Sequence, residues 1–178
     1  MTRLLNCTAK AMAIAAFLSL VSCDSAPTNE MTSEDKLARI EEMIDQYQQQ
    51  FPDVPGIDAA ALRDDLARDA VVLVDVRTED ERTTSMIAGA ISREEFELRS
   101  AEFEGSAIVT YCTIGYRSGD YAQKLRQEGW DARNFDGSIL AWTHAGEELV
   151  DAEGNPTRRV HVFGERWNLA AEGYEPVW

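Results

Sequence analysis

One cysteine, one glycine and one arginine lie close together in the segment Y-C-T-I-G-Y-R-S, residues 111–118. Cys112 follows an apolar run, Gly115 stands three residues later and Arg117 five residues later. A cysteine reacts as its thiolate, which forms most readily beside backbone N–H groups, a helix N-terminus or a cation. The segment therefore predicts a nucleophilic cysteine in an anion-binding turn between a strand and a helix.

Two residues of this turn could serve the sulfur in different ways. Gly115 permits a backbone twist that a side chain would oppose. Arg117 offers a cation, either to a bound anion or to a partner elsewhere in the protein. The alternative is that Cys112 is a small buried hydrophobe without chemistry, the usual role of an isolated cysteine.

The N-terminal segment decides how many cysteines compete for this role. Residues 1–22 carry Arg3 and Lys10 before and at the start of a short apolar run, and they end in Leu-Val-Ser ahead of Cys23. The pattern resembles the signal peptide and lipobox of bacterial lipoproteins, which implies that Cys23 is lipidated and becomes the first mature residue. A plain signal peptide cleaved nearby is the alternative. From the lipobox resemblance we expect a lipid-anchored, extracytoplasmic protein facing the periplasm. Asp24 resembles an inner-membrane retention signal.

Such processing would leave Cys112 as the only free thiol, since Cys7 leaves with the signal peptide and Cys23 carries lipid. The mature chain then offers only His144 and His161 beside Cys112, which argues against a zinc site built on cysteine and histidine. We expect no metal and no cofactor. The formal net charge of −15 argues against a nucleic-acid partner, because phosphates repel an acidic surface. The sequence does not identify a protein partner.

The remaining chain suits one domain with an extension at each end. Residues 23–33 form a polar tether, and residues 34–52 carry apolar side chains every three or four positions, which predicts an amphipathic helix. Residues 53–148 form the domain. Residues 149–178 form a C-terminal extension, whose aromatic side chains either pack on the domain or present a surface to a partner.

Within the domain, segments with strand patterns alternate with segments with helix patterns. The expected strands are 71–76, 86–91 (broken at its glycine), 107–111 and 132–135. The expected helices are 58–68, a single turn at 78–82, a solvated helix at 93–104, 118–129 and 138–146. This alternation predicts an α/β domain with a mostly parallel sheet flanked by helices, and ligands beyond the carboxyl ends of its strands. Asp75, Arg77 and Cys112 all follow or end such strands.

Four motifs of this sequence resemble those of rhodanese-like sulfurtransferases, and they follow one another along the chain in the same order as in that family. The cysteine loop has their C-x-x-G-x-R form, and residues 74–77 (V-D-V-R) resemble their D-x-R segment. Residues 87–91 (I-A-G-A-I) resemble their I-x-G-A-I element, and residues 135–142 (F-D-G-S-I-L-A-W) resemble the L-x-G-G-I-x-x-W motif that closes their fold. The resemblance covers about residues 55–146 and implies a rhodanese-like fold. Ser138 replaces the second glycine of the last motif, and we expect it not to touch the cysteine loop.

The resemblance also implies an activity. Cys112 would take the outer sulfur of thiosulfate or of a persulfide donor, and would pass it from a Cys112 persulfide to a thiol acceptor or to cyanide. Backbone N–H groups of the loop would hold the terminal sulfur anion. The loop residues are Thr113, Ile114, Gly115, Tyr116, Arg117 and Ser118. Asp75 and Arg77 would hold the base of the loop by hydrogen bonds and an ion pair.

Two other functions stay open. Phosphatases and arsenate reductases also use a cysteine in an anion-binding loop, but their loops resemble C-x5-R. Here Arg117 follows at C-x4-R, and Ser118 occupies the place of that arginine, so the shorter loop favours a single sulfur over a phosphate. Rhodanese-like domains also serve as non-catalytic binding modules, although those usually lack the cysteine.

Overall fold

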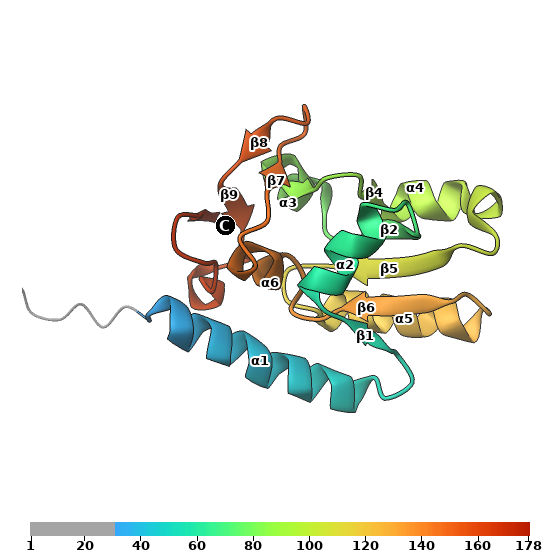
Figure 1. Cartoon of the computed structure of the whole chain (residues 1–178), viewed down its shortest axis with the longest axis horizontal. Coiled ribbons are helices and arrows are strands. Elements are labelled where there is room, and N and C mark those ends of the chain that lie inside the picture. The colour runs from blue at the N-terminus through green and yellow to red at the C-terminus, as the bar shows by residue number, and fades with distance from the viewer. Residues whose placement is uncertain (1–30) are drawn as a thin grey trace, which may run out of the picture. The chain divides into compact units, whose positions relative to one another are not determined.

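A five-stranded parallel sheet lies at the centre of residues 31–178, the part of the chain that the computed structural model describes (Figure 1). Its strand order is β1-β6-β5-β2-β4, and every neighbouring pair is parallel. The strands are β1 (Gly56–Ile57), β2 (Val71–Asp75), β4 (Ile91–Ser92), β5 (Ala107–Tyr111) and β6 (Ala132–Phe135). The predicted α/β class with a mostly parallel sheet is therefore confirmed. The predicted signal peptide and Cys23 lie outside the described residues.

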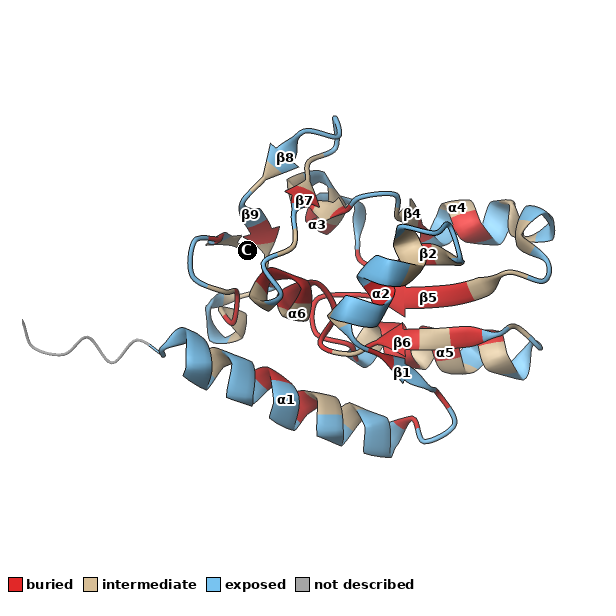
Figure 2. Cartoon of the chain, viewed as in Figure 1, coloured by how far each residue is buried: buried red, intermediate tan, exposed pale blue. Residues whose placement is uncertain are grey.

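Apolar layers cover both faces of this sheet, which is why its longest strands read as continuous apolar runs. Successive strand side chains point to opposite faces, so Leu73 and Val74 belong to different layers. Helices α1 (Ser33–Gln50), α2 (Ala59–Leu66) and α6 (Ser138–His144) contribute to one layer. Helices α4 (Arg93–Leu98) and α5 (Tyr116–Gln127) contribute to the other. Figure 2 shows β5 and β6 as largely buried between them.

Helix α1 confirms the predicted amphipathic helix and packs directly on the start of α6. Its N-cap, Thr32, forms a capping box with Asp35, and its Ile40 is fully buried. A Cβ at Gly137 would lie 2.9 Å from a methyl group of Ile40, so the close approach of α1 excludes a side chain there. Like every other helix within residues 31–178, α1 is not long and apolar enough to cross a membrane.

The segment 86–91 is divided between two sheets rather than forming one broken strand. Strand β3 (Met86–Ile87) joins β7 (Leu149–Val150) and β8 (Pro156–Thr157) in a small antiparallel sheet, while β4 joins the central sheet. Gly89 turns the chain between them with a φ of +79°, a conformation that favours glycine.

The prediction of one solvated helix over 93–104 is wrong. Helix α4 ends at Leu98 and is followed by a 3-10 turn, η1 (Ser100–Phe103). Phe96 is buried at 1% exposure, and Phe103 folds back to stack on it with ring centroids 5.6 Å apart. We attribute the end of α4 to this stacking, because the free energy gained by burying the two rings exceeds that of continuing the helix. The many glutamates of the segment would otherwise favour a longer helix. Helix α2 also ends two residues before the predicted position, although Asp58 caps its start as expected.

The C-terminal extension packs on the domain, which answers the question that the sequence left open. Strand β9 (Arg159–His161) pairs in parallel with β10 (Glu175–Val177), and Val160 is fully buried in the same apolar layer as α1 and α6. The extension is also tied to α6, because the imidazole Nε2 of His144 lies 2.8 Å from the carbonyl oxygen of Leu169.

Candidate active site

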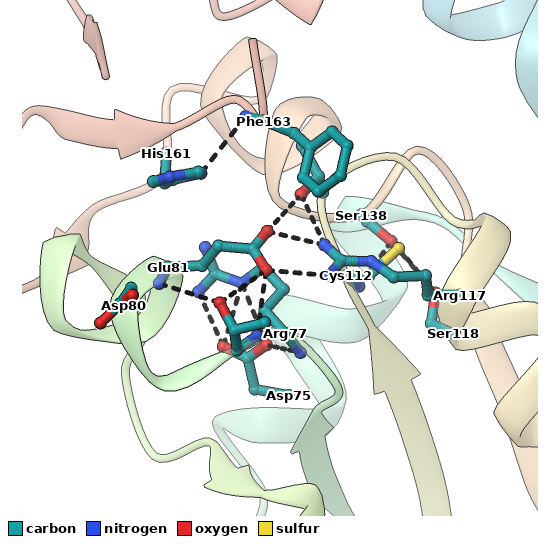
Figure 3. A network of polar contacts seen from close by, with 12 residues as sticks. Asp75, Arg77, Asp80, Glu81, Cys112, Arg117, Ser118, Ser138, His161 and Phe163 are labelled. Carbon is teal, nitrogen blue, oxygen red and sulfur yellow. Dashed lines mark hydrogen bonds and ion pairs between the residues drawn. The ribbon is translucent and has the colours of Figure 1, made fainter. Parts of the chain in front are cut away.

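Cys112 directly follows β5 and begins the turn into α5 (Figure 3). Its sulfur accepts a hydrogen bond from the backbone N–H of Gly115 at 3.1 Å and lies 3.5 Å from the hydroxyl oxygen of Ser118. Gly115 has a φ of +112° and caps α5, so the helix begins at Tyr116, slightly earlier than predicted. The first-turn N–H groups of a helix have no partner inside it. In α5 these belong to Tyr116, Arg117 and Ser118, beside the sulfur.

The environment of Cys112 favours its thiolate. Burial by itself opposes ionisation, since the thiol is only 1% exposed. The Ser118 hydroxyl, the charge of Arg117 and the backbone N–H groups of Ser118 and Gly115 outweigh this effect and lower the pKa of Cys112 below its usual value. The turn therefore favours the thiolate, which is the nucleophilic form of cysteine.

Replacing Ser118 by alanine is expected to raise the pKa of Cys112, because one hydrogen bond to the thiolate is lost. The rate of alkylation by iodoacetamide, measured against pH, reports the thiolate fraction. It falls as the pH drops through the pKa, so the midpoint should move to higher pH in Ser118→Ala. Ser33→Ala, at an exposed serine of α1, is the matched control. An unchanged midpoint in Ser118→Ala would show that its hydroxyl does not act on the sulfur.

Arg117 forms a two-pronged ion pair with Glu81, a residue that the sequence analysis did not identify. The guanidinium donates to both carboxylate oxygens, at 2.8 and 2.6 Å, and Thr113 donates its hydroxyl to the same carboxylate at 3.1 Å. Glu81 lies on α3 (Glu79–Thr84) and is only 2% exposed. The partner of Arg117, which the sequence left open, is therefore a buried carboxylate that ties the cysteine loop to α3 (Figure 3).

The Glu81–Arg117 pair predicts a distinct acid response. Burial raises the pKa of Glu81, but the hydrogen bonds and charge of Arg117 and the Thr78 N–H lower it from 4.5 to about 2. A lowered carboxylate pKa stabilises the fold above about pH 4.5, and this stabilisation is lost as the pH falls towards 2. It amounts to roughly 2 kcal/mol after solvent screening at the partly exposed Arg117.

We therefore expect Glu81→Gln to lose less unfolding free energy between pH 4.5 and pH 2 than the wild type loses. Urea unfolding at a series of pH values measures this difference. Parallel pH profiles for the two proteins would contradict the assignment of the lowered pKa to Glu81.

Asp75 and Arg77 form a buried ion pair at the carboxyl end of β2, with side chains 1% and 0% exposed. Arg77 donates to Asp75 from its backbone N, Nε and Nη2, and Nη2 also donates to the carbonyl oxygen of Ser85 at 2.7 Å. The hydroxyl of Tyr111 donates to Asp75 at 2.6 Å. Since Tyr111 immediately precedes Cys112, this network fixes the end of β5 from which the cysteine loop departs. This geometry agrees with the supporting role expected for the pair.

Ser138 contacts the cysteine loop, so the expectation that it would not is wrong. The backbone N–H of Cys112 donates to the Ser138 hydroxyl oxygen at 3.1 Å, and that hydroxyl lies 3.5 Å from the hydroxyl of Ser118. The N–H of Ile139 donates to the carbonyl oxygen of Cys112 at 3.2 Å. The start of α6 therefore holds the backbone of Cys112 from both sides. Ser138 adopts a φ of +52°, a conformation that glycine would reach more easily.

A cavity of about 230 Å³ opens above Cys112. Thr113, Ile114, Tyr116 and Arg117 from the cysteine loop contribute to its wall. The other side chains of the wall come from beyond the loop. They are Tyr47 from α1, and Phe163 and Trp167 from the C-terminal extension. These three are distant from the loop in sequence, so no local pattern could have assigned them to the site.

Comparison with known proteins identifies the family to which the central part of this chain is similar. The family model described as Rhodanese-like domain matches residues 58–145. An uncharacterized protein from Synechocystis is 36% identical over 103 residues, covering 54% of this chain and 58% of the relative. The match thus spans little more than half the length of that curated relative.

Two solved structures are similar to part of this chain. A rhodanese-related protein from Thermoplasma volcanium is 26% identical, with a TM-score of 0.48, over 54% of this chain and 97% of that protein. A thiosulfate sulfurtransferase from Pseudomonas aeruginosa is 26% identical, with a TM-score of 0.53, over 65% of this chain and 23% of that enzyme. The family match, the parallel sheet and the similarity to the Pseudomonas aeruginosa enzyme together show that residues 58–145 are a rhodanese-like domain, with Cys112 in its C-x-x-G-x-R loop.

Proposed function

We propose that this protein is a sulfurtransferase that carries sulfane sulfur on Cys112 as a persulfide. The observation that carries the proposal is the state of Cys112, whose sulfur accepts the Gly115 N–H at the helix start, lines a cavity and has a lowered pKa. The donor is thiosulfate or a persulfide, and the acceptor is a thiol or cyanide. No metal or cofactor takes part in the proposed reaction.

The transfer needs only groups that the site and its substrates supply. The Cys112 thiolate attacks the terminal sulfur of the donor, a bond from Sγ to that sulfur forms, and the sulfur–sulfur bond of the donor breaks. The leaving group, sulfite in the case of thiosulfate, departs with the bonding electron pair. An acceptor thiolate or cyanide then attacks the outer sulfur of the persulfide and releases the Cys112 thiolate. Because the loop lowers the pKa of Cys112 and so favours its thiolate, the proposed reaction uses no separate general base.

The negative charge of the persulfide lies where the start of α5 can stabilise it. Unpartnered N–H groups and the positive end of the helix dipole favour an anion at this position. These donors are fixed before the substrate arrives, so little reorganisation is needed during the reaction. The hydrogen bonds of Ser138 and Ile139 to the Cys112 backbone support this fixed geometry.

Phosphatase or arsenate reductase chemistry is the main rival, and two observations weigh against it. A loop that binds a phosphate dianion uses its arginine as a bidentate partner for the oxyanion. Here the guanidinium of Arg117 already donates to both oxygens of Glu81. The spacing of Cys112 and Arg117 is also one residue shorter than in C-x5-R loops.

A comparison of three activities tests the proposed function. The purified mature protein should form thiocyanate from cyanide and a sulfane donor, and should hydrolyse aryl phosphates and reduce arsenate no faster than its Cys112→Ala variant. Arsenate reduction or phosphate hydrolysis that depends on Cys112 would establish the rival instead. Equal thiocyanate formation by the wild type and Cys112→Ala would exclude the enzyme and leave the non-catalytic binding module.

We further propose that the mature protein is anchored to a bacterial membrane through lipid on Cys23 and faces the periplasm. The support is the sequence pattern of residues 1–23 alone. Cys23→Ser should release the protein from the membrane fraction. Membrane retention of a signal-cleaved form without lipid would overturn the proposed anchor, and it would leave the proposed activity untouched.

A further inference from the structure

The cavity above Cys112 is walled mainly by aromatic rings. Tyr47, Tyr116, Phe163 and Trp167 surround the approach to the sulfur. The volume of about 230 Å³ is ample for a ring-sized group, since cavities of about 150 Å³ accept benzene. A small inorganic anion needs no such wall, whereas an apolar group gains free energy by leaving water against it.

The charges around the cavity do not suit a dianion. Arg117 is the only lysine, arginine or histidine among the described residues that line it, and its charge is balanced by the buried carboxylate of Glu81. Thiosulfate carries two negative charges, and both must leave water to reach Cys112. The N–H groups of the loop can stabilise the sulfur end of a donor, but the aromatic wall offers nothing to a second charge.

The aromatic wall is built into the fold rather than left by chance. Tyr47 packs edge-on against Tyr116, with ring centroids 5.5 Å apart. The chain on either side of the other two aromatics is anchored, because Val162 is fully buried and Leu169 is 4% exposed. The backbone that carries Phe163 and Trp167 is therefore held beside the cavity by buried neighbours.

Phe163 differs from the other wall residues because its exposed ring and its backbone conformation are both energetically unfavourable. The ring is 63% exposed, and the backbone adopts a φ of +68°, which is unfavourable for a bulky residue. This conformation holds the ring over the guanidinium of Arg117, with 5.6 Å between the guanidinium carbon and the ring centroid. Figure 3 shows Phe163 above the Glu81–Arg117 pair and close to the sulfur. The exposed ring is also part of the cavity wall, where a ligand can contact it.

We propose that the preferred sulfur donor is an organic compound with an aromatic or similarly bulky apolar body and no more than one negative charge. This inference rests on the proposed sulfurtransferase function and names its substrate class. The sulfane sulfur enters towards the loop, and the apolar body lies against Tyr47, Phe163 and Trp167. With an arenethiosulfonate, the Cys112 thiolate takes the terminal sulfur and the arenesulfinate departs with the electron pair. One negative charge enters with the donor and one leaves with the sulfinate.

Two donors with the same reacting group test the inference. The full mature protein is given benzenethiosulfonate or methanethiosulfonate, with cyanide as acceptor, and kcat/KM is measured for each donor. Each value is divided by the rate constant of that donor with free cysteine, which removes the difference in intrinsic reactivity. We expect the normalised value for benzenethiosulfonate to exceed that for methanethiosulfonate by about 10-fold or more.

Alanine substitutions in the aromatic wall test which side chains cause the preference for the aromatic donor. Phe163→Ala and Trp167→Ala should each reduce the ratio between the donors several-fold. Phe163 is exposed, so its replacement does not endanger the core. Trp178→Ala, at an aromatic residue that is 63% exposed and does not line the cavity, is the matched control and should keep the wild-type ratio.

The outcomes separate this inference from the proposed function. A normalised ratio near one in the wild type would overturn the proposed preference for an aromatic organic donor, and so would a ratio that Phe163→Ala and Trp167→Ala leave unchanged. Neither result would contradict the proposed sulfurtransferase function. If neither thiosulfonate transfers sulfur to Cys112 while thiosulfate or a persulfide does, the organic donor is overturned and the proposed function stands. If thiosulfate and a persulfide also fail, the proposed function is overturned together with the inference.

Discussion

Replacing Cys112 by serine is expected to lower kcat/KM for sulfur transfer to cyanide by at least about 10³-fold. A serine hydroxyl is not ionised at neutral pH, and it cannot form the persulfide through which the sulfur passes. Serine differs from cysteine by one atom, and the N–H of residue 112 keeps its bond to Ser138. The loss should therefore reflect chemistry rather than folding. Thiocyanate formation measures the rate.

Unfolding by urea supplies the control for this variant. The unfolding free energy of Cys112→Ser should stay within about 1.5 kcal/mol of the wild type, because a thiol of similar size is replaced at a site that also contains Ser118 and Ser138. If a stably folded Cys112→Ser retained more than a tenth of the wild-type rate, the persulfide mechanism would be wrong.

Asp75→Asn is expected to lower the unfolding free energy by about 3–5 kcal/mol. Both side chains of the Asp75–Arg77 pair are essentially buried, so the variant removes the ion-pair partner of the Arg77 charge inside the protein. Tyr111 also loses a charged acceptor at the end of β5. A loss of this size is a large part of the total stability of a typical domain. Urea unfolding at neutral pH measures it.

The exposed pair Asp120–Lys124 offers a matched control for the same chemical change. Its side chains are 48% and 56% exposed, so Asp120→Asn should cost less than about 1 kcal/mol. Equal losses for Asp75→Asn and Asp120→Asn would mean that burial of the Asp75–Arg77 pair is not what makes it important.

Local patterns predicted the position of Cys112 correctly. The apolar runs at 71–76 and 107–111 indicated two buried strands, and alternation with helices indicated that these strands are parallel. Parallel strands end at the same edge of a sheet, which places Cys112 near Asp75 and Arg77. The structure confirms this arrangement, and the register pairs Asp75 with Tyr111.

The partner of Arg117 could not be predicted in the same way. Thr78 and Glu81 have the spacing of a capping box, a signal that marks the start of a helix. That signal does not reveal that the Glu81 carboxylate also reaches Arg117, since this depends on how α3 lies against the cysteine loop. The contact of Ser138 with Cys112 was missed for a similar reason, because it depends on the approach of α6.

The aromatic wall of the cavity depends on the extensions at both ends of the domain. Tyr47 precedes residues 58–145, while Phe163 and Trp167 follow them. The sequence predicted the helix that carries Tyr47, but its burial pattern gave no indication of which ring would face the sulfur. Such contacts form through tertiary packing, which residue spacing within one element does not encode.

The intact mass of the mature protein after treatment with a sulfane donor tests the central claim most directly. Thiosulfate and benzenethiosulfonate are each used, and excess donor is removed before the measurement. The account predicts that the wild type gains one sulfur atom from at least one donor, loses it again to cyanide, and that Cys112→Ala gains none. A wild-type mass that neither donor changes, or an equal gain in Cys112→Ala, would contradict the persulfide on Cys112.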